Sequence, residues 1–316
     1  MSEGPLFLVT GGAGFIGSHL VEELVRAGER VRVLDNFLTG RRENLEGLAG
    51  RFELIEGDVR EPETCRRAVR GASCVLHQAA LPSVPRSLRE PALSNAINVG
   101  GTLNMLAASR EAGVKRFVFA SSSSVYGDDE RLPKREGSEG TPLSPYAVTK
   151  AAGEKYCQVF NRTLGLPCVC LRYFNIFGPR QDPSSQYAAV IPLFISACLE
   201  GRPPTIFGDG TQSRDFTYVS NVVRANLLAC RAEEAPGRVM NIACGGRATV
   251  SELVSHIRDI LGSREEPVFG PPRPGDVLHS WADLAQAERV LGYRPEVGLR
   301  EGLERTVRWY KENKGT

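Results

Sequence analysis

The sequence has little that would take the protein to a membrane or a nucleic acid. It contains no apolar run of the roughly 18 residues that a membrane-spanning helix needs. Its first residues, Met1 to Pro5, carry neither the basic stretch nor the cleavage site of a secretion signal. The formal net charge is only +2, which gives no electrostatic case for nucleic acid or anionic lipid. We therefore expect a cytoplasmic protein with neither as its partner.

The sequence also lacks the patterns of a metal site or a disulfide framework. Its eight cysteines include no Cys-x-x-Cys pair, and its four histidines are scattered. Cys168 and Cys170 alternate along an apparent strand and should share one face. We interpret the cysteines as small buried side chains in a reducing compartment. His19 is interpreted as a packing or phosphate-side residue, and no metal is expected.

What the chain does have is an alternation of short apolar strands and amphipathic helices. With 41% hydrophobic and 24% charged residues in 316, it is long enough for a sizeable core. The apolar pattern predicts strands at residues 6–10, 30–34, 52–56, 74–78, 116–120, 168–173 and 239–242. Helical periodicity lies between them at residues 15–27, 62–70, 91–112 and 146–164. This predicts an α/β fold, a Rossmann-like doubly wound parallel sheet.

The texture changes after Tyr173, where loops become longer and richer in proline and glycine. Helices are expected there at about 187–200, 219–231, 249–260 and 298–311. We predict that residues 1–172 plus 216–242 form the sheet domain. Residues 173–215 plus 243–316 should form a smaller, mixed α/β C-terminal lobe.

A glycine-rich turn joins the first strand to the first helix. Gly11 allows the tight turn, Gly14 lets a pyrophosphate approach the backbone, and Gly17 lets the helix lie close to the sheet. The N-terminus of the helix adds N–H donors and the positive end of its dipole. In this strand–turn–helix context the motif predicts a dinucleotide site.

An acid at the end of the second strand selects the dinucleotide. Asp35, followed by Asn36, is placed to bind the adenosine ribose hydroxyls and would repel a 2′-phosphate, so NAD is favoured over NADP. Arg41 and Arg42 could weaken this preference, although a solvated loop is the plainer interpretation for them. Asp58-Val59 and Gln78-Ala79-Ala80, after the third and fourth strands, are further cofactor candidates.

Tyr146 and Lys150 lie one helical turn apart and should share a face. An ammonium beside a phenol favours tyrosinate and lowers a pKa that is ordinarily near ~10. A phenol tuned in this way can serve as a general base for a sugar or steroid hydroxyl. The pair by itself is a weak signal, and its weight depends on the rest of the chain.

Taken together, these motifs resemble the extended short-chain dehydrogenase/reductase superfamily, and within it the UDP-hexose 4-epimerases. The resemblance covers nearly all of the chain. Its markers are Gly11-x-x-Gly14-x-x-Gly17, His77-Gln78-Ala79-Ala80, Ser121–Gly127, Tyr146-x-x-x-Lys150, Leu171–Asn175, Ser213–Phe216 and Arg273–Asp276.

The resemblance implies tightly bound NAD with NAD+ as its resting form. Tyr146 would take the proton of the sugar 4-hydroxyl with help from Ser122, and Lys150 would hold the cofactor ribose. Hydride would leave C4 and return to the opposite face of a 4-keto sugar. The implied cofactor contacts are Gly11, Gly14, Phe15, Ile16, Gly17, Asp35, Asn36, Asp58, Val59, Gln78, Ala79, Ala80, Asn98, Ser121, Tyr146, Lys150 and Tyr173.

The resemblance also separates epimerisation from elimination. Related dehydratases carry an Asp-Glu pair directly after the position of Ser122, and related decarboxylases usually carry an acid there. Here the two positions are Ser123 and Ser124, so no carboxylic acid is placed to protonate a leaving hydroxyl.

A UDP-sugar is the implied substrate. Arg214 and Arg273 would pair with its phosphates, Asp276 with the uridine ribose, and Val190, Leu193 and Phe207 with the nucleoside. The implied substrate contacts are Ser83, Val84, Arg86, Ser122, Ser123, Ser124, Asn175, Ala189, Val190, Leu193, Thr205, Phe207, Arg214, Arg273, Asp276 and Ser280.

Three positions bear on the identity of the sugar. In the epimerases a tyrosine at the position of Ser280 limits the pocket to UDP-glucose and UDP-galactose, whereas a small residue admits N-acetyl sugars. Pro82 departs from the glycine or lysine usual in those enzymes. The UDP-glucuronate 4-epimerases share that proline but tend to carry arginine where this chain has Asp182, which would repel a uronate. We expect neutral hexoses, including UDP-N-acetylglucosamine.

Other possibilities remain open at this stage. They are a UDP-glucuronate 4-epimerase, a net NAD(P)H-dependent sugar-nucleotide reductase and a silent dinucleotide sensor, although such sensors typically lack the Tyr/Lys pair. The resemblance also implies a homodimer with a four-helix interface made from the helices at 91–112 and 146–164.

Overall fold

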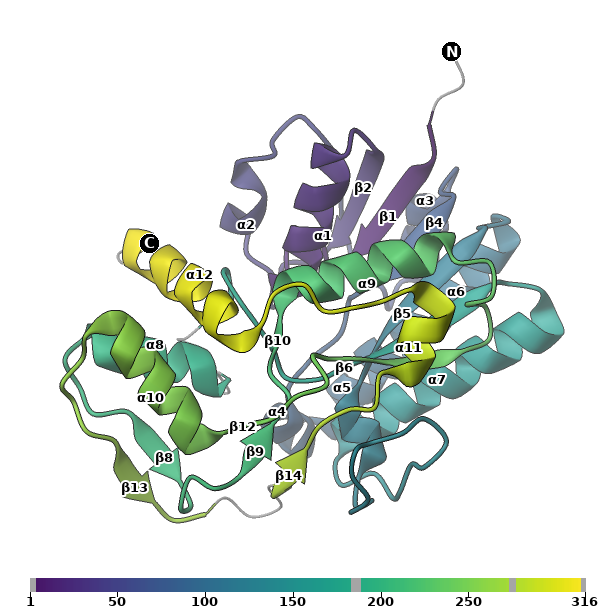
Figure 1. Ribbon diagram of the computed structural model, residues 1–316. Helices are drawn as coiled ribbons and strands as arrows, with labels where there is room; N and C mark the ends of the chain where they lie inside the picture. Colours follow the sequence, from purple (N-terminus) through teal and green to yellow (C-terminus); the bar gives the residue numbers. More distant parts are fainter. Residues whose placement is uncertain (1–3, 183–188, 273–276, 314–316) are drawn as a thin grey trace.

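A parallel sheet of seven strands forms the centre of the protein (Figure 1). The computed structural model describes residues 4–182, 189–272 and 277–313. The sheet has the order β11-β6-β5-β4-β1-β2-β3. Its strands are β1 Leu6–Thr10, β2 Arg30–Asp35, β3 Glu53–Glu56, β4 Cys74–His77, β5 Arg116–Ser122, β6 Cys168–Tyr173 and β11 Val239–Ile242. All strands are parallel, and the order in which they are added reverses at β1, with β2 and β3 on one side and β4, β5, β6 and β11 on the other, so the predicted Rossmann-like doubly wound sheet is confirmed.

Helices cover both faces of this sheet. Successive strand residues point to opposite faces, so Val9 packs with α1, α9 and α11, whereas Leu8 packs with α3, α6 and α7. The helices of this part are α1 Phe15–Arg26, α2 Glu43–Glu46, α3 Pro62–Val69, α4 Val84–Arg89, α5 Pro91–Asn95, α6 Thr102–Glu111, α7 Pro145–Leu164, α9 Val219–Arg231 and α11 Ala285–Leu291.

The helix predicted over residues 91–112 is present but irregular. A π-helical turn, η1 (Ala96–Gly101), separates α5 from α6. Gly101 lies against the next layer, where a Cβ would come within 2.5 Å of a methyl group of Val59. A π turn inside a helix often accompanies a functional site, and this one carries Asn98.

The remaining elements enclose a third apolar cluster. Figure 1 shows α8, α10 and α12 gathered to one side of the sheet, and Phe194, Leu253 and Leu303 pack together there. The elements are β7 Ile176–Phe177, α8 Val190–Leu199, β8 Thr205–Phe207, β9 Ser213–Arg214, β10 Thr217–Tyr218, β12 Ala248–Thr249, α10 Val250–Leu261, β13 Val268–Gly270, β14 His279–Ser280 and α12 Leu299–Glu312.

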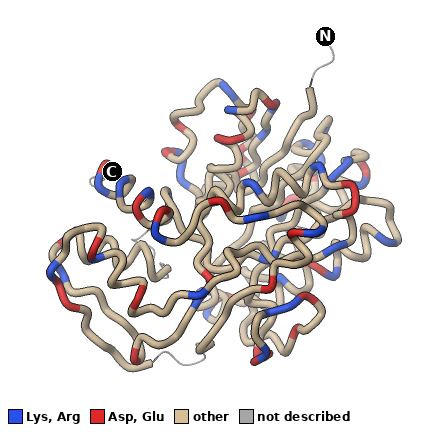
Figure 2. The backbone as a smooth tube through the Cα atoms, viewed as in Figure 1, with Lys and Arg blue, Asp and Glu red and all other residues tan. Residues whose placement is uncertain are grey.

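The sequence patterns did not indicate the short helices α2, α4 and α11, nor the 3-10 turn η2 (Ser123–Tyr126). One or two turns are too short to show helical periodicity. Acidic and basic residues are interspersed over the backbone in the view of Figure 2. Among the described residues no helix has the length and apolar character needed to cross a bilayer.

Candidate active site

A cavity of about 870 Å³ opens along the carboxyl ends of the sheet strands. This is where parallel α/β sheets bind ligands, beside the strand at which the strand order reverses. Most of the predicted cofactor residues lie in its wall. They are Gly11, Gly14, Phe15, Ile16, Gly17, Asp35, Asn36, Asp58, Val59, Gln78, Ala79, Ala80, Ser121, Tyr146, Lys150 and Tyr173.

The glycine turn has the geometry that a pyrophosphate site requires. Gly11 has φ +67°, and a Cβ there would lie 2.8 Å from the backbone nitrogen of Ala79. A Cβ on Gly17 would lie 2.1 Å from the carbonyl oxygen of Gly11, so only glycine allows α1 to start this close to the strand end. Gly14 is the N-cap of α1 and has no side chain over the free N–H groups. These residues therefore fit a dinucleotide phosphate.

Asp35 joins the glycine turn to the loop after β2. Its carboxylate accepts hydrogen bonds from the backbone N–H of Ala13 and of Phe37, each at 2.8 Å. Burial raises the pKa of Asp35, and these two hydrogen bonds oppose the rise. The carboxylate also lies in the cavity wall. Asn36 donates to Asp58 at 2.7 Å, and Arg60 holds the pKa of Asp58 below its usual range.

Tyr146 and Lys150 lie on one face of α7, as predicted, but they do not form a close pair. The Nζ atom of Lys150 donates to the carbonyl oxygen of Ala120 at 2.8 Å. Burial raises the pKa of Tyr146 to about 12, and only a hydrogen bond with Ser122 opposes this. The expected lowering of the tyrosine pKa by Lys150 is therefore wrong for the chain's own groups. Burial instead lowers the pKa of Lys150 itself to about 8.

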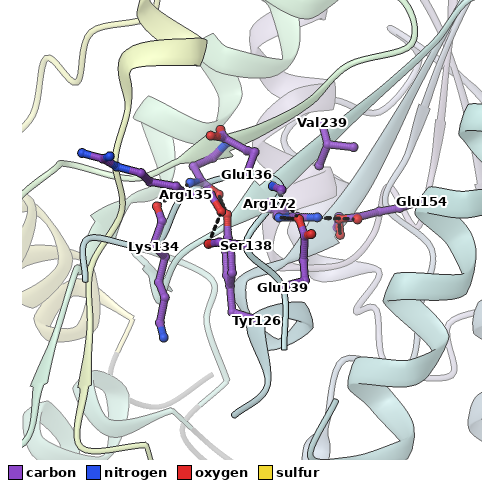
Figure 3. A network of polar contacts seen from close by, with 12 residues as sticks. Tyr126, Lys134, Arg135, Glu136, Ser138, Glu139, Glu154, Arg172 and Val239 are labelled. Carbon is purple, nitrogen blue, oxygen red and sulfur yellow. Dashed lines mark hydrogen bonds and ion pairs between the residues drawn. The ribbon is translucent and has the colours of Figure 1, made fainter. Parts of the chain in front are cut away.

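Behind these residues lies a buried ion pair (Figure 3). Arg172 on β6 makes two bonds to Glu154 on α7, at 2.8 Å and 2.7 Å. Glu154 also accepts from the hydroxyl of Ser121 at 2.5 Å, so this predicted cofactor residue turns its side chain towards the ion pair. Arg172 contacts a second carboxylate, Glu139, at 2.5 Å. The network ties α7, β5 and β6 together beside Lys150.

The hydroxyl of Tyr173 is held by hydrogen bonds from Asn226 and Gln78. The amide of Asn226 on α9 donates to its hydroxyl at 2.8 Å, and the amide nitrogen of Gln78 lies 3.2 Å from the same oxygen. Burial raises the pKa of Tyr173, which keeps the phenol neutral. No sequence signal had indicated Asn226, which is fully buried.

Asn98 lies behind the cavity wall rather than in it. Its side-chain oxygen accepts from the backbone N–H of Leu81 at 2.7 Å. Its amide nitrogen donates at 3.0 Å to the hydroxyl of Thr149, which lies between Tyr146 and Lys150 in the sequence. Asn98 therefore connects the chain after β4 to the helix that carries the Tyr/Lys pair.

A second cavity, of about 260 Å³, adjoins the first in the C-terminal part. Asn175 and Ala189 line both cavities. The predicted substrate residues fall into three groups. Ser83, Arg86, Ser122 and Ser123 line the large cavity. Val190, Leu193, Thr205, Phe207 and Arg214 line the small one.

The third group is placed differently. Val84, Ser124 and Ser280 are in neither wall, although Ser280 pairs in register with Arg214. The buried hydroxyl oxygen of Ser124 has no hydrogen-bond partner in the part of the chain that the structure describes. Arg273 and Asp276 lie outside the described residues.

The cavity wall also contains residues that the motifs had not assigned. The chain after β2, residues 38–41, lines it, as do Gln181 and Asp182 from the segment after β7. Arg41, which the sequence left between a cofactor role and a solvated loop, is in this wall. Within the described residues there is no group of three or more His, Cys, Asp or Glu side chains placed to hold a metal ion.

The doubly wound sheet, the glycine turn with Asp35, and the tyrosine–serine–lysine group in the wall of the same cavity define an enzyme that works with a dinucleotide. Comparison with known proteins gives the family. The sequence profile of the NAD dependent epimerase/dehydratase family matches residues 7–243. UDP-glucose 4-epimerase of Mycolicibacterium smegmatis is 39% identical over 308 residues, which are 96% of this chain and 98% of the relative.

Two solved structures extend the likeness. UDP-N-acetylglucosamine 4-epimerase of Methanobrevibacter ruminantium, solved with UDP-N-acetylmuramic acid, has a TM-score of 0.94 at 39% identity and covers 98% of this chain and 99% of its own. UDP-glucose 4-epimerase of Thermus thermophilus, solved with NAD, has a TM-score of 0.88 at 39% identity with the same coverage. This chain belongs to the NAD dependent epimerase/dehydratase family, as an extended short-chain dehydrogenase/reductase of the UDP-hexose 4-epimerase group. It is an NAD-dependent epimerase.

Proposed function

We propose that this enzyme inverts C4 of neutral UDP-hexoses through a transient 4-keto sugar. It would interconvert UDP-glucose with UDP-galactose and UDP-N-acetylglucosamine with UDP-N-acetylgalactosamine. The observation that carries the proposal is the hydrogen bond between Ser122 and Tyr146 in a wall where Ser123, not an acid, comes next. The described wall also contains the acid Asp35, but Asp35 lies on β2, and β4 and β1 lie between β2 and β5. Three strand spacings amount to about 14 Å, so this carboxylate is remote from Ser122 at the end of β5.

The chain's own groups would divide the proton and positioning work. Tyr146 would exchange the proton of the sugar 4-hydroxyl. Ser122 would align the phenol oxygen of Tyr146 with the oxygen of that hydroxyl. Lys150, fixed by the carbonyl oxygen of Ala120, would orient the cofactor ribose and add positive charge. NAD, when bound, supplies the hydride acceptor and donor. Glu154 and Arg172 would hold α7 in a fixed position against β5 and β6 behind these groups.

The small cavity suits the UDP end of the substrate. Its apolar wall at Val190, Leu193 and Phe207 would hold the nucleoside, and Arg214 would meet a phosphate. We propose on the same grounds that residues 1–172 plus 216–242 bind NAD and that residues 173–215 plus 243–316 bind the UDP-sugar. The sugar itself would lie near Asn175, which lines both cavities.

Asp182 repels a uronate less than the sequence suggests. The carboxylate of Asp182 forms an ion pair with Arg41 at 2.7 Å, and this reduces its repulsion of another carboxylate. Neutral hexoses remain the proposal, and the small side chain at Ser280 would admit N-acetyl sugars among them. The deciding experiment supplies UDP-glucose, UDP-N-acetylglucosamine and UDP-glucuronate to purified protein without added cofactor. The highest kcat/KM on UDP-glucuronate would overturn it, and activity without added NAD+ would show tight cofactor retention.

We also propose a homodimer. Leu88 on α4 and Val148 on α7 are 62% and 53% exposed, which is unusual for large apolar side chains. Tyr156 and Val159 follow Val148 at helical spacing along the same face of α7. A second copy of this chain, pairing α7 and the neighbouring helices into a four-helix interface, would cover them.

A further inference from the structure

A short segment after β7 is tied to the first helix of the sheet domain. The carbonyl oxygen of Pro179 accepts a hydrogen bond from Nε2 of His19 at 3.0 Å. Because a carbonyl only accepts, Nε2 carries the proton, and burial lowers the pKa of His19 to about 4. Arg180 then forms an ion pair with Glu22 at 2.5 Å. Residues 179 and 180 are thus fixed along α1, the helix that starts at the glycine turn.

The next residues of this segment are held as well. The carbonyl oxygen of Gln181 accepts from the hydroxyl of Tyr310 on α12, and its side-chain nitrogen donates to the carbonyl oxygen of Ile176 at 3.2 Å. Asp182 therefore belongs to a segment that is held by contacts with α1 and with α12. It lines the large cavity together with Arg41.

Arg41 reaches Asp182 from the loop after β2. Its backbone N–H donates to the carbonyl oxygen of Ala13 at 3.0 Å, and its guanidinium lies 2.7 Å from the Asp182 carboxylate. The preceding residue, Gly40, is close to Asp35, since a Cβ on Gly40 would lie 3.1 Å from a carboxylate oxygen of Asp35. Arg41 therefore leaves the backbone beside the acid that meets the adenosine ribose.

The ion pair is too exposed to be a major source of stability. The side chains of Arg41 and Asp182 are 49% and 34% exposed, and pairs of this kind contribute about 0–1 kcal/mol to folding. Its consequence is for the ligand. An arginine beside the acid of β2 is the group that accommodates the 2′-phosphate of NADP, and a carboxylate bound to that arginine competes for it and repels the phosphate.

We infer that Asp182 is a second determinant of the choice of NAD over NADP, acting from the substrate side of the cleft by holding Arg41 beside Asp35. With Asp35 alone, the adjacent guanidinium of Arg41 would still favour a 2′-phosphate. The Asp182 carboxylate counteracts it. The inference concerns the cofactor and is independent of which sugar the enzyme accepts.

The neighbouring residue supplies a matched control. Arg42 forms an ion pair with Glu56 at 2.6 Å and lies over the ring of Phe37 at 3.9 Å. It follows β2 just as Arg41 does, but neither Arg42 nor Glu56 is in the cavity wall. Removing the Glu56 carboxylate takes one negative charge from the partner of the neighbouring arginine, as Asp182→Asn does for Arg41, without touching the Arg41–Asp182 pair.

The test measures the nucleotide bound at equilibrium, not turnover. Purified holoenzyme is incubated with equal concentrations of NAD+ and NADP+ until exchange is complete, and the bound nucleotides are released, separated and quantified. In Asp182→Asn we expect the bound NADP+/NAD+ ratio to rise about five- to tenfold over wild type, and the rise to shrink at high salt. In Glu56→Gln the ratio should stay within about twofold of wild type.

A double variant separates the role of Arg41 from a general change of charge. In Asp182→Asn combined with Arg41→Gln, the gain in NADP+ should disappear, because the guanidinium that binds the phosphate is gone. An unchanged ratio in Asp182→Asn would overturn the inference. So would an equal rise in Glu56→Gln, or a gain that persists in the double variant. Each of these results can be read even if the epimerase has a different sugar substrate.

Discussion

The ammonium nitrogen of Lys150 lies 5.9 Å from the centre of the Tyr146 ring and donates instead to the backbone of Ala120 at the end of β5. The two residues share a helix face, but the side chain of the lysine is directed to the sheet. Burial therefore dominates the phenol and raises its pKa to about 12. The chain alone keeps Tyr146 protonated, so ionisation at neutral pH depends on charge that ligands bring to the cavity.

Tyr146→Phe removes the hydroxyl that would exchange the substrate proton. We expect kcat to fall by about 10²- to 10⁴-fold, the usual contribution of general acid–base catalysis, while the Kd of the UDP-sugar changes little. Steady-state kinetics and calorimetric titration measure the two effects. Tyr156→Phe, on the exposed side of the same helix, is the control. Turnover near the wild-type rate in Tyr146→Phe would remove this tyrosine from the mechanism.

Ser280→Tyr tests the expected breadth of the sugar pocket. A larger side chain there should reduce kcat/KM for UDP-N-acetylglucosamine by about tenfold or more, because the N-acetyl group needs the space, and should leave UDP-glucose within about threefold. Both substrates are assayed in parallel with the same preparation. Equal losses on the two sugars would contradict the role of Ser280, which lies outside the described cavity walls and pairs with Arg214.

Two histidines, the half-buried His19 and the buried His77, predict acid sensitivity. Burial lowers the pKa of His19 to about 4 and that of His77 to about 3. Between pH 6.5 and 4 the unfolded chain binds more protons than the folded protein, so the free energy of unfolding falls as the pH falls. His19→Gln keeps an N–H for Pro179 and should remove about 1–2 kcal/mol of that fall. Urea unfolding at pH 4.5 and 6.5 measures it, with the half-buried His256→Gln as the control. If the free energy of unfolding fell by the same amount between pH 6.5 and 4.5 in wild type and His19→Gln, the prediction would be contradicted.

Glu154→Gln should be among the most destabilising single substitutions in the sheet domain. It leaves the buried guanidinium of Arg172 without its two-bond carboxylate partner, which typically costs about 3–5 kcal/mol. Urea unfolding should show a lower midpoint with an unchanged slope. Glu139→Gln is the matched control, since Glu139 contacts the same arginine but is 32% exposed (Figure 3). Equal effects of both substitutions would contradict the assigned weight of the buried pair.

Val148→Glu tests the proposed dimer. A charge on the exposed apolar face of α7 should convert the protein to monomer, because two copies would bury facing carboxylates. Light scattering after size-exclusion chromatography gives the mass directly. Phe269→Glu, a change at another exposed apolar side chain on β13, should leave the mass unchanged. A wild-type protein that is already monomeric at high concentration would refute the interface.

Much of the fold could be predicted because its signals are local. Strand–helix alternation implied the parallel sheet, and all seven predicted strands are present. Gly11 and Gly17 have close backbone approaches that no other residue allows, and a Cβ on Gly14 would lie 3.1 Å from the carbonyl oxygen of Gly11. Asp35 lies in the cavity because the carboxyl end of a parallel strand always points to the same edge of the sheet.

Only the tertiary structure decided the contacts between residues that are distant in the sequence. Arg41 and Asp182 are 141 residues apart, and Ser121 and Glu154 are 33 apart. Asn98 is a predicted cofactor contact, yet its side chain connects Leu81 to Thr149 behind the wall. Spacing along one helix fixes only which residues share a face. The direction of a long side chain such as that of Lys150, and the pKa values that follow, depend on burial and on partners from other strands.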